Sequence, residues 1–171
     1  MPLLKRLVAA SLAVTDKSAR LVQEIFQHGN LKIEDKGGLK NYQTEADTKI
    51  EQLLVGNLEK HFPGIAIVGE ESETGKISDE SYWIDFEKAC GDLPAFDNCP
   101  EIADPSQITV WLDPLDGTAE FIDGLLSHVT TLIGIAYEGK ALAGIINQPF
   151  YKNADGTARL ENMRIWGLKI G

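Results

Sequence analysis

The sequence has 171 residues, 43% of them hydrophobic, so the chain is long enough to bury one sizeable core. Its formal net charge is −10. Such an acidic surface disfavours nucleic acids and anionic membranes as partners, because both are bound through clusters of lysine and arginine. A small phosphorylated ligand is not excluded, since carboxylates can first recruit divalent cations that then carry the positive charge.

Cysteine content and hydropathy favour a cytoplasmic protein. Cys90 and Cys99 are the only cysteines, and their spacing is typical of neither a zinc site nor a disulfide framework. No stretch approaches the roughly 20 apolar residues of a membrane span. The apolar residues that follow Lys5 recur at helical spacing, which indicates a core helix rather than a signal peptide.

Two amphipathic helices are predicted in the first part of the chain. Residues 3–28 form one long helix, and Gly29 suits the left-handed conformation that ends a helix. A second helix is predicted from Thr44, which can cap it, to about Lys60. Pro63 and Gly64 then prevent its continuation.

Strands are predicted in most of the remainder. Residues 65–69 and 108–112 are interpreted as buried strands, and residues 129–137 and 141–146 as a hairpin around a short turn that contains glycine. The final run RIWGLKIG, residues 164–171, is a further predicted strand. Helices that precede strands, with one short helix between the strands, indicate an α+β fold rather than regular βαβ alternation.

The stretch between the first two strands has a different composition. Residues 72–107 are rich in Ser, Asp, Glu, Gly and Pro, and are predicted to form an insertion or a lid. Trp83, Trp111 and Trp166 are interpreted as core anchors rather than as platforms for base stacking.

The densest chemical signal is Asp113-Pro114-Leu115-Asp116-Gly117-Thr118, between a strand and a short helix predicted from Thr118 to about Leu125. Two carboxylates three residues apart can reach one hard cation, and the Leu115 carbonyl can add a neutral oxygen ligand. Gly117 permits a close backbone approach, and a helix start can bind phosphate. A bare Asp-Pro-x-Asp pair favours an ordinary turn, but the full hexapeptide, with Glu70 at a second strand end, predicts a functional site.

Other residues carry weaker signals. Asp47, taken alone, is interpreted as a helix-start charge favoured by the helix dipole. The sequence has no G-x-S-x-G nucleophile motif and no phosphate-binding G-x-x-x-x-G-K-S/T loop. His28, His61 and His128 lack the spacing of metal ligands. Competing catalytic designs therefore find little support.

These acidic motifs together resemble the metal signature of the inositol-monophosphatase-like phosphatases. The hexapeptide is preceded by Thr44-Glu45-Ala46-Asp47 and Gly69-Glu70-Glu71, and residues 124–151, GLLSHVTTLIGIAYEGKALAGIINQPFY, are similar to the bisphosphate nucleotidases of this superfamily. The resemblance covers nearly the whole chain. It implies a lithium-sensitive, Mg²⁺-dependent enzyme that converts adenosine 3',5'-bisphosphate to AMP and phosphate. An inositol phosphate 1-phosphatase is the nearest alternative within the superfamily.

The resemblance also assigns metal ligands. It implies that Glu70, Asp113 and the Leu115 carbonyl bind one Mg²⁺, and that Asp113 and Asp116 bind a second. Asp113 would then bridge the two ions, and both ions would act on one phosphate group.

Two further roles follow from the same resemblance. Asp47 and Thr118 match the pair that positions and deprotonates the attacking water, which replaces the interpretation of Asp47 as a helix-start charge. Gly117 and Thr118 match the residues that bind the substrate phosphate.

One departure from the family is a missing motif. Family members are longer, and a later Trp-Asp motif gives the second metal a further carboxylate, whereas no Trp-Asp dipeptide occurs here. We therefore expect residues 1–171 to form an N-terminal α+β metal-binding domain without the family's C-terminal α/β domain. Such a chain should bind metal, turn over slowly, and form oligomers through an uncovered sheet. A truncated metal-binding or interaction module without catalysis is the alternative from a different functional class.

Overall fold

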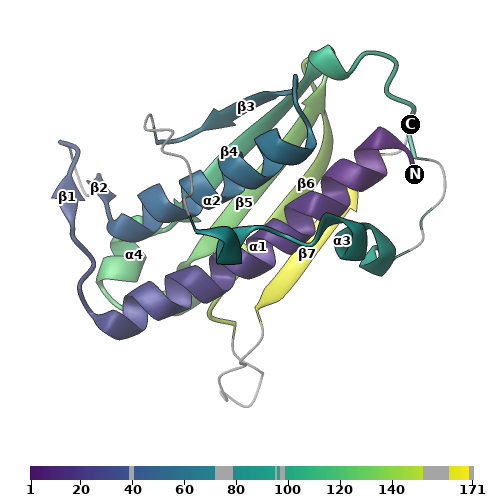
Figure 1. Ribbon diagram of the computed structural model, residues 1–171. Helices are drawn as coiled ribbons and strands as arrows, with labels where there is room; N and C mark the ends of the chain where they lie inside the picture. The colour runs from purple at the N-terminus through teal and green to yellow at the C-terminus, as the bar shows by residue number, and fades with distance from the viewer. Residues whose placement is uncertain (39–40, 72–78, 95, 97–98, 152–161, 170–171) are drawn as a thin grey trace.

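The computed structural model describes residues 1–38, 41–71, 79–94, 96, 99–151 and 162–169. Two long helices, α1 (Leu3–His28) and α2 (Glu45–His61), pack against each other and cover one face of a five-stranded sheet (Figure 1). The predicted α+β fold is confirmed, and the N-terminal helix pair lies on a largely antiparallel sheet.

The sheet has the strand order β3-β4-β5-β6-β7. Its strands are β3 (Ala66–Gly69), β4 (Ile108–Asp116), β5 (Thr130–Tyr137), β6 (Lys140–Gln148) and β7 (Met163–Leu168). β3 runs parallel to β4, and the other neighbouring pairs are antiparallel. Because parallel strands end at the same edge of a sheet, the residues after β3 lie beside the end of β4. A small separate ribbon, β1 (Glu34–Asp35) and β2 (Tyr42–Gln43), contacts α2 through β2.

Helix α1 has the predicted bounds, for local reasons. Its apolar residues return every three or four positions, so one face of the helix is buried against α2 and the sheet. Gly29 follows the last residue with a φ of 73°, in the left-handed conformation, and its amide donates to the Phe26 carbonyl. A residue with a side chain would be strained at that position, so the glycine marks where the helix ends.

The two faces of the sheet differ because side chains alternate along each strand. Val110, Ile133 and Ile145 point toward the helices and are fully buried. A buried polar contact joins the two layers, since Asn147 Nδ2 donates to the Thr15 carbonyl at 2.9 Å. The opposite face leaves large apolar side chains exposed: Val68, Trp111, Ile146 and Ile165. The interpretation of Trp111 as a core anchor is therefore wrong: its side chain is 56% exposed, since it alternates with Val110.

The described part of the stretch 72–107 packs against the helices. It contains η1 (Glu80–Tyr82), α3 (Phe86–Asp92) and η2 (Pro105–Gln107), and α3 contacts α1. The side chain of Asn57, in α2, accepts from Ile84 N at 2.9 Å and donates to the Tyr82 carbonyl at 3.1 Å. Residues 72–78, 95, 97 and 98 lie outside the described residues, and the insertion or lid stays a prediction.

Three sequence predictions differ in detail from the structure. Strand β3 is an edge strand with Val68 exposed, not a buried strand, because it has one neighbour and the helices cover only one face. Strand β4 continues to Asp116 instead of ending at residue 112, with a register shift between Asp113 and Asp116. The short helix α4 (Thr118–Ile122) ends before Leu125 and is followed by η3 (Leu126–His128).

The predicted hairpin between β5 and β6 is confirmed. Glu138 and Gly139 both have positive φ, 49° and 72°. A two-residue loop of this kind matches the right-handed twist of the flanking strands.

None of the helices in the described residues has both the length and the apolarity needed to cross a membrane. The cytoplasmic location stays a prediction.

Candidate active site

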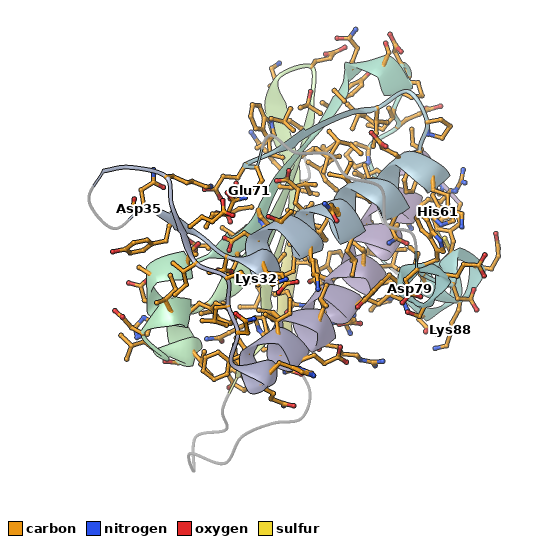
Figure 2. The ribbon with its side chains drawn as sticks, turned by 60° about the vertical axis from the view of Figure 1, so that its left-hand side comes forward. Lys32, Asp35, His61, Glu71, Asp79 and Lys88 are labelled. Carbon is orange, nitrogen blue, oxygen red and sulfur yellow. The ribbon has the colours of Figure 1, made fainter. Side chains whose placement is uncertain are left out.

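Three segments that are distant in the sequence meet at one end of the molecule: the start of α2, the end of β3, and the turn from β4 into α4. Gly69 pairs with Leu112, so the next residues, Glu70 and Asp113, extend from adjacent parallel strands. In Figure 2, Glu71 and Asp35 lie at this end, whereas His61, at the last residue of α2, lies at the other. The sheet topology therefore brings together acidic residues from separate motifs.

Asp47 lies at the start of α2 and is 2% exposed. Thr44 caps the helix, and Asp47 Oδ2 accepts from the Thr44 amide at 2.7 Å and from its hydroxyl at 2.6 Å. The other carboxylate oxygen, Oδ1, lies 3.0 Å from Thr118 Oγ1. Burial raises the pKa of Asp47, although the hydrogen bonds from Thr44 and Thr118 oppose the rise. The structure thus brings together Asp47 and Thr118, 71 residues apart in the sequence.

Thr118 is shared between two acceptors. Its Oγ1 lies 3.0 Å from Asp47 Oδ1 and 3.0 Å from the Leu115 carbonyl oxygen, so its single proton can be donated to either. The Leu115 side chain is buried and anchors this turn in the core. Thr131 Oγ1 donates to the Pro114 carbonyl at 2.9 Å and so supports the turn from β5.

Asp113 is the most perturbed carboxyl group of the site. Burial, followed by the negative charges of Glu70 and Asp116, raises its pKa from 3.8 to about 7. Its Oδ1 is buried and has no hydrogen-bond partner among the described residues. Three carboxylates that repel one another around a buried unpaired oxygen would be stabilised by a cation.

The carboxylates do not enclose a metal ion in this conformation. Among the described residues, no three His, Cys, Asp or Glu side chains converge closely enough to do so. Asp116 is directed to Thr130, whose Oγ1 donates to Asp116 Oδ2 at 3.0 Å. Asp116 is exposed, so its side chain can turn toward Asp113 without repacking the core.

Gly117 connects β4 to α4 in a conformation that requires glycine. Its φ is 88°, and a Cβ built there would lie 3.0 Å from the His128 carbonyl oxygen. A side chain would be strained by both the backbone angle and the contact. The glycine therefore allows Asp116 and Thr118 to flank one tight turn.

Glu51 is a buried acidic residue that the sequence predictions missed. It lies one helical turn after Asp47 and is 1% exposed. Its Oε2 accepts from the Glu71 amide at 2.7 Å. The Glu71 side chain in turn pairs with Lys36. The available signal was a single acidic residue within the apolar face of the α2 helix, next to Ile50.

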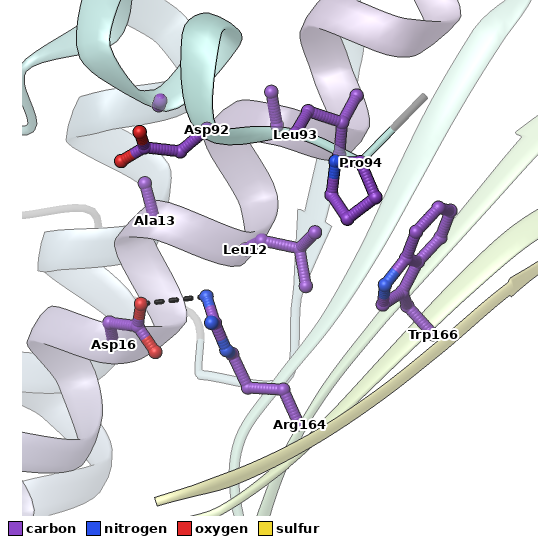
Figure 3. Close-up of a pocket in the computed structure, with 10 residues that line it drawn as sticks. Leu12, Ala13, Asp16, Asp92, Leu93, Pro94, Arg164 and Trp166 are labelled. Carbon is purple, nitrogen blue, oxygen red and sulfur yellow. Dashed lines mark hydrogen bonds and ion pairs between the residues drawn. The ribbon is translucent and has the colours of Figure 1, made fainter. Parts of the chain in front are cut away.

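Two of the cavities in the described part of the chain differ in their relation to the site. A cavity of about 700 Å³ is lined by Thr44 and Glu70 of the site, and also by Lys32, Lys36 and Lys49. It provides open space beside the carboxylates, and its three lysines are ion-paired with Glu45 and Glu71. The other cavity, about 290 Å³, lies between α1, α3 and β7 (Figure 3) and shares no lining residue with the site. There Arg164 Nη1 donates to Asp16 Oδ2 at 2.7 Å.

Curated relatives and solved structures resemble this chain. Human (Homo sapiens) 3'(2'),5'-bisphosphate nucleotidase 1 is 36% identical over 173 residues, which cover 96% of this chain and 54% of the relative. The extragenic suppressor protein suhB from Bartonella henselae superposes with a TM-score of 0.60 at 24% identity, covering 84% of this chain and 44% of that chain. An IMPase/NADP phosphatase complexed with Mg²⁺ and phosphate superposes with a TM-score of 0.50 at 18% identity, covering 76% of this chain and 40% of that chain.

These matches cover most of this chain but only about half of each relative. The chain spans about half the length of the curated relatives it matches. The model of the inositol monophosphatase family matches residues 3–170, and the matched range contains every residue of the site described above. The chain therefore belongs to the inositol monophosphatase family.

Proposed function

We propose that this chain forms a Mg²⁺-dependent phosphomonoesterase site that removes the 3'- or 2'-phosphate of an adenosine bisphosphate, giving AMP and phosphate from adenosine 3',5'-bisphosphate. The observation that carries the proposal is Asp113: a half-buried carboxylate with an unpaired oxygen, flanked by Glu70 and Asp116. The choice of substrate is supported by relatives at 36% and 37% identity that are named 3'(2'),5'-bisphosphate nucleotidase 1.

The donor set fits magnesium. Glu70, Asp113, Asp116 and the Leu115 carbonyl offer only oxygen atoms, which Mg²⁺ prefers. We assign Glu70, Asp113 and the Leu115 carbonyl to one ion, and Asp113 with Asp116 to a second. Bound there, the cations would supply the positive charge that polarises a phosphoryl group and lowers the pKa of water. An IMPase/NADP phosphatase of the same fold was solved with Mg²⁺ and phosphate, which supports a divalent metal in such a site.

The chain's own residues orient the attacking water. Thr44 donates to one oxygen of Asp47, which fixes the carboxylate and leaves the other oxygen to accept the Thr118 proton. The Thr118 oxygen then has lone pairs that can accept a proton from water. Because burial raises the pKa of Asp47, this carboxylate accepts a proton more readily than an exposed aspartate does.

The substrate phosphate is assigned to the turn at Gly117 and Thr118. The absence of a side chain at Gly117 leaves the backbone accessible to phosphate oxygens. The water oxygen forms a bond to phosphorus as the bond to the ribose oxygen breaks. The proton of the attacking water passes through Thr118 to Asp47, and the leaving oxygen takes a proton from solvent and ends as a hydroxyl group. No covalent intermediate on the protein is needed, so the residues act through position and charge.

A second candidate is hydrolysis of inositol phosphates, which the family match favours. Phosphate release should be measured with adenosine 3',5'-bisphosphate and with inositol 1-phosphate, with Mg²⁺ and with EDTA. We expect Mg²⁺-dependent release from the nucleotide at a higher kcat/KM than from the inositol phosphate. The reverse preference would assign the chain to the second candidate. Metal binding without release from either substrate would favour the metal-binding module.

A further inference from the structure

Glu51 is a buried carboxylate that takes no part in the proposed mechanism. It is 1% exposed and lies in α2, four residues after Asp47. Residues four apart share a face of a helix, so Asp47 and Glu51 both point toward the end of the sheet where the site lies.

A hydrogen bond and a close approach place the Glu51 carboxylate against the end of β3. Its Oε2 accepts a hydrogen bond from the Glu71 amide at 2.7 Å. A Cβ built at Gly69 would lie 2.3 Å from the same oxygen, so the Glu51 carboxylate fills the space that a side chain at Gly69 would occupy. Residue 70 is therefore held between two residues that contact one carboxylate.

A contribution to folding stability does not explain why a carboxylate occupies this buried position. The Glu51 carboxylate is buried, and burial disfavours the charged form of a carboxylate. Its second oxygen, Oε1, is buried and has no hydrogen-bond partner among the described residues. An apolar side chain of similar volume would fill the same space without that cost.

We propose that Glu51 is a positioning residue that fixes the Gly69–Glu71 turn, so that the Glu70 carboxylate faces Asp113. This role rests on the proposed function, in which Glu70 and Asp113 bind a metal ion. Helix α2 then acts as one rigid support: Asp47 holds Thr118 at the helix start, and Glu51 holds the Glu70 turn one helical turn later. The water-orienting pair and the metal ligand are thereby placed relative to each other.

Two substitutions distinguish the effect of the position of the Glu51 carboxylate from the effect of its charge. Glu51→Gln keeps an oxygen that can accept from the Glu71 amide but removes the charge. Glu51→Asp keeps the charge but withdraws the carboxylate by one methylene. Asn57→Ala is the matched control, because Asn57 is a fully buried polar residue of α2 that contacts the segment around Ile84 and not the site.

The measurements are hydrogen exchange of the Glu71 amide in EDTA and calorimetric titration with Mn²⁺, both on the 171-residue chain. In Glu51→Asp we expect exchange to accelerate about tenfold and Mn²⁺ affinity to fall about tenfold, the loss of one hydrogen bond to a charged group. Glu51→Gln should stay within about threefold of wild type in both. Asn57→Ala should lower thermal stability but leave both site measurements unchanged.

Three results would overturn the proposal. The first is a Glu51→Asp variant that behaves as wild type. The second is a Glu51→Gln variant as impaired as Glu51→Asp, which would show that the charge of Glu51 rather than its position matters. The third is an Asn57→Ala variant that loses Mn²⁺ affinity equally, which would show a general loss of stability. A wild-type chain that binds no Mn²⁺ would instead contradict the proposed metal site, and Glu71 exchange would still decide whether Glu51 positions the turn.

Discussion

Replacing Asp113 by asparagine tests whether a cation belongs among the three carboxylates. The ionised form of Asp113 is disfavoured in the metal-free fold, since burial and the charges of Glu70 and Asp116 raise its pKa from 3.8 to about 7. Asparagine has nearly the same shape and cannot ionise. The metal-free variant should therefore be more stable than the wild type at alkaline pH, although it lacks a central metal ligand.

The magnitude follows from the pKa. The rise from 3.8 to about 7 gives an upper bound of ~4 kcal/mol, at ~1.4 kcal/mol for each pKa unit. Asp113 is only half-buried, so solvent screening reduces this to ~1–2 kcal/mol. A raised pKa means that the contribution of Asp113 to stability is full below about pH 4 and is lost as the pH rises through about 7. The gain from asparagine should therefore be near zero at about pH 4 and reach its full value at about pH 8.

Urea unfolding in EDTA, followed by tryptophan fluorescence at the two pH values, measures this difference. Added Mg²⁺ should then stabilise the wild type but not Asp113→Asn, because the variant lacks the proposed bridging ligand. Asp123→Asn removes an equal charge from an exposed residue and serves as the control. A pH-independent difference between Asp113→Asn and wild type, or an equal response of both to Mg²⁺, would refute the reasoning.

Three further predictions concern the same turn and its ions. Asp113→Asn should weaken Mg²⁺ binding more than Asp116→Asn, because Asp113 serves both ions; calorimetry that gives equal affinities would contradict the bridging role. Gly117→Ala should lower the free energy of unfolding by ~1–3 kcal/mol, because its φ is 88° and the His128 carbonyl is close; an unchanged urea midpoint would contradict the strain argument. Millimolar lithium should inhibit any Mg²⁺-dependent phosphate release; unchanged rates in lithium would contradict this expectation.

The elements that the sequence predicted well are those set by local patterns. The bounds of α1 follow from apolar spacing and Gly29, and the start of α2 follows from the Thr44 cap. The hairpin at Glu138 and Gly139 is likewise a local signal. These signals act within one or two turns of the chain, so they do not depend on the rest of the fold.

What the sequence could not predict depends on contacts between distant segments. The pairing of β3 with β4 joins residues about 40 positions apart, and no local pattern specifies whether such a pair is parallel. Trp111 was misassigned because the pattern of β4 does not say which of its faces the helices cover. Glu51 was missed because an acidic residue in a helix is usually solvated, and its burial depends on packing against the distant end of β3. The contact of Asp47 with Thr118 was expected from the family resemblance, not from spacing.

The edge position of β3 has a consequence for how tightly the site can bind a cation. This four-residue strand has one neighbour in the sheet and exposes Val68, so few contacts oppose its local opening. Glu70 moves with it, and a cation that binds Glu70 and Asp113 together selects the docked strand. The measured affinity therefore contains the free energy of docking β3, and by linkage a bound cation should slow the local opening of this strand. Metal affinity and the order of β3 would then both report the equilibrium between the docked and the open strand.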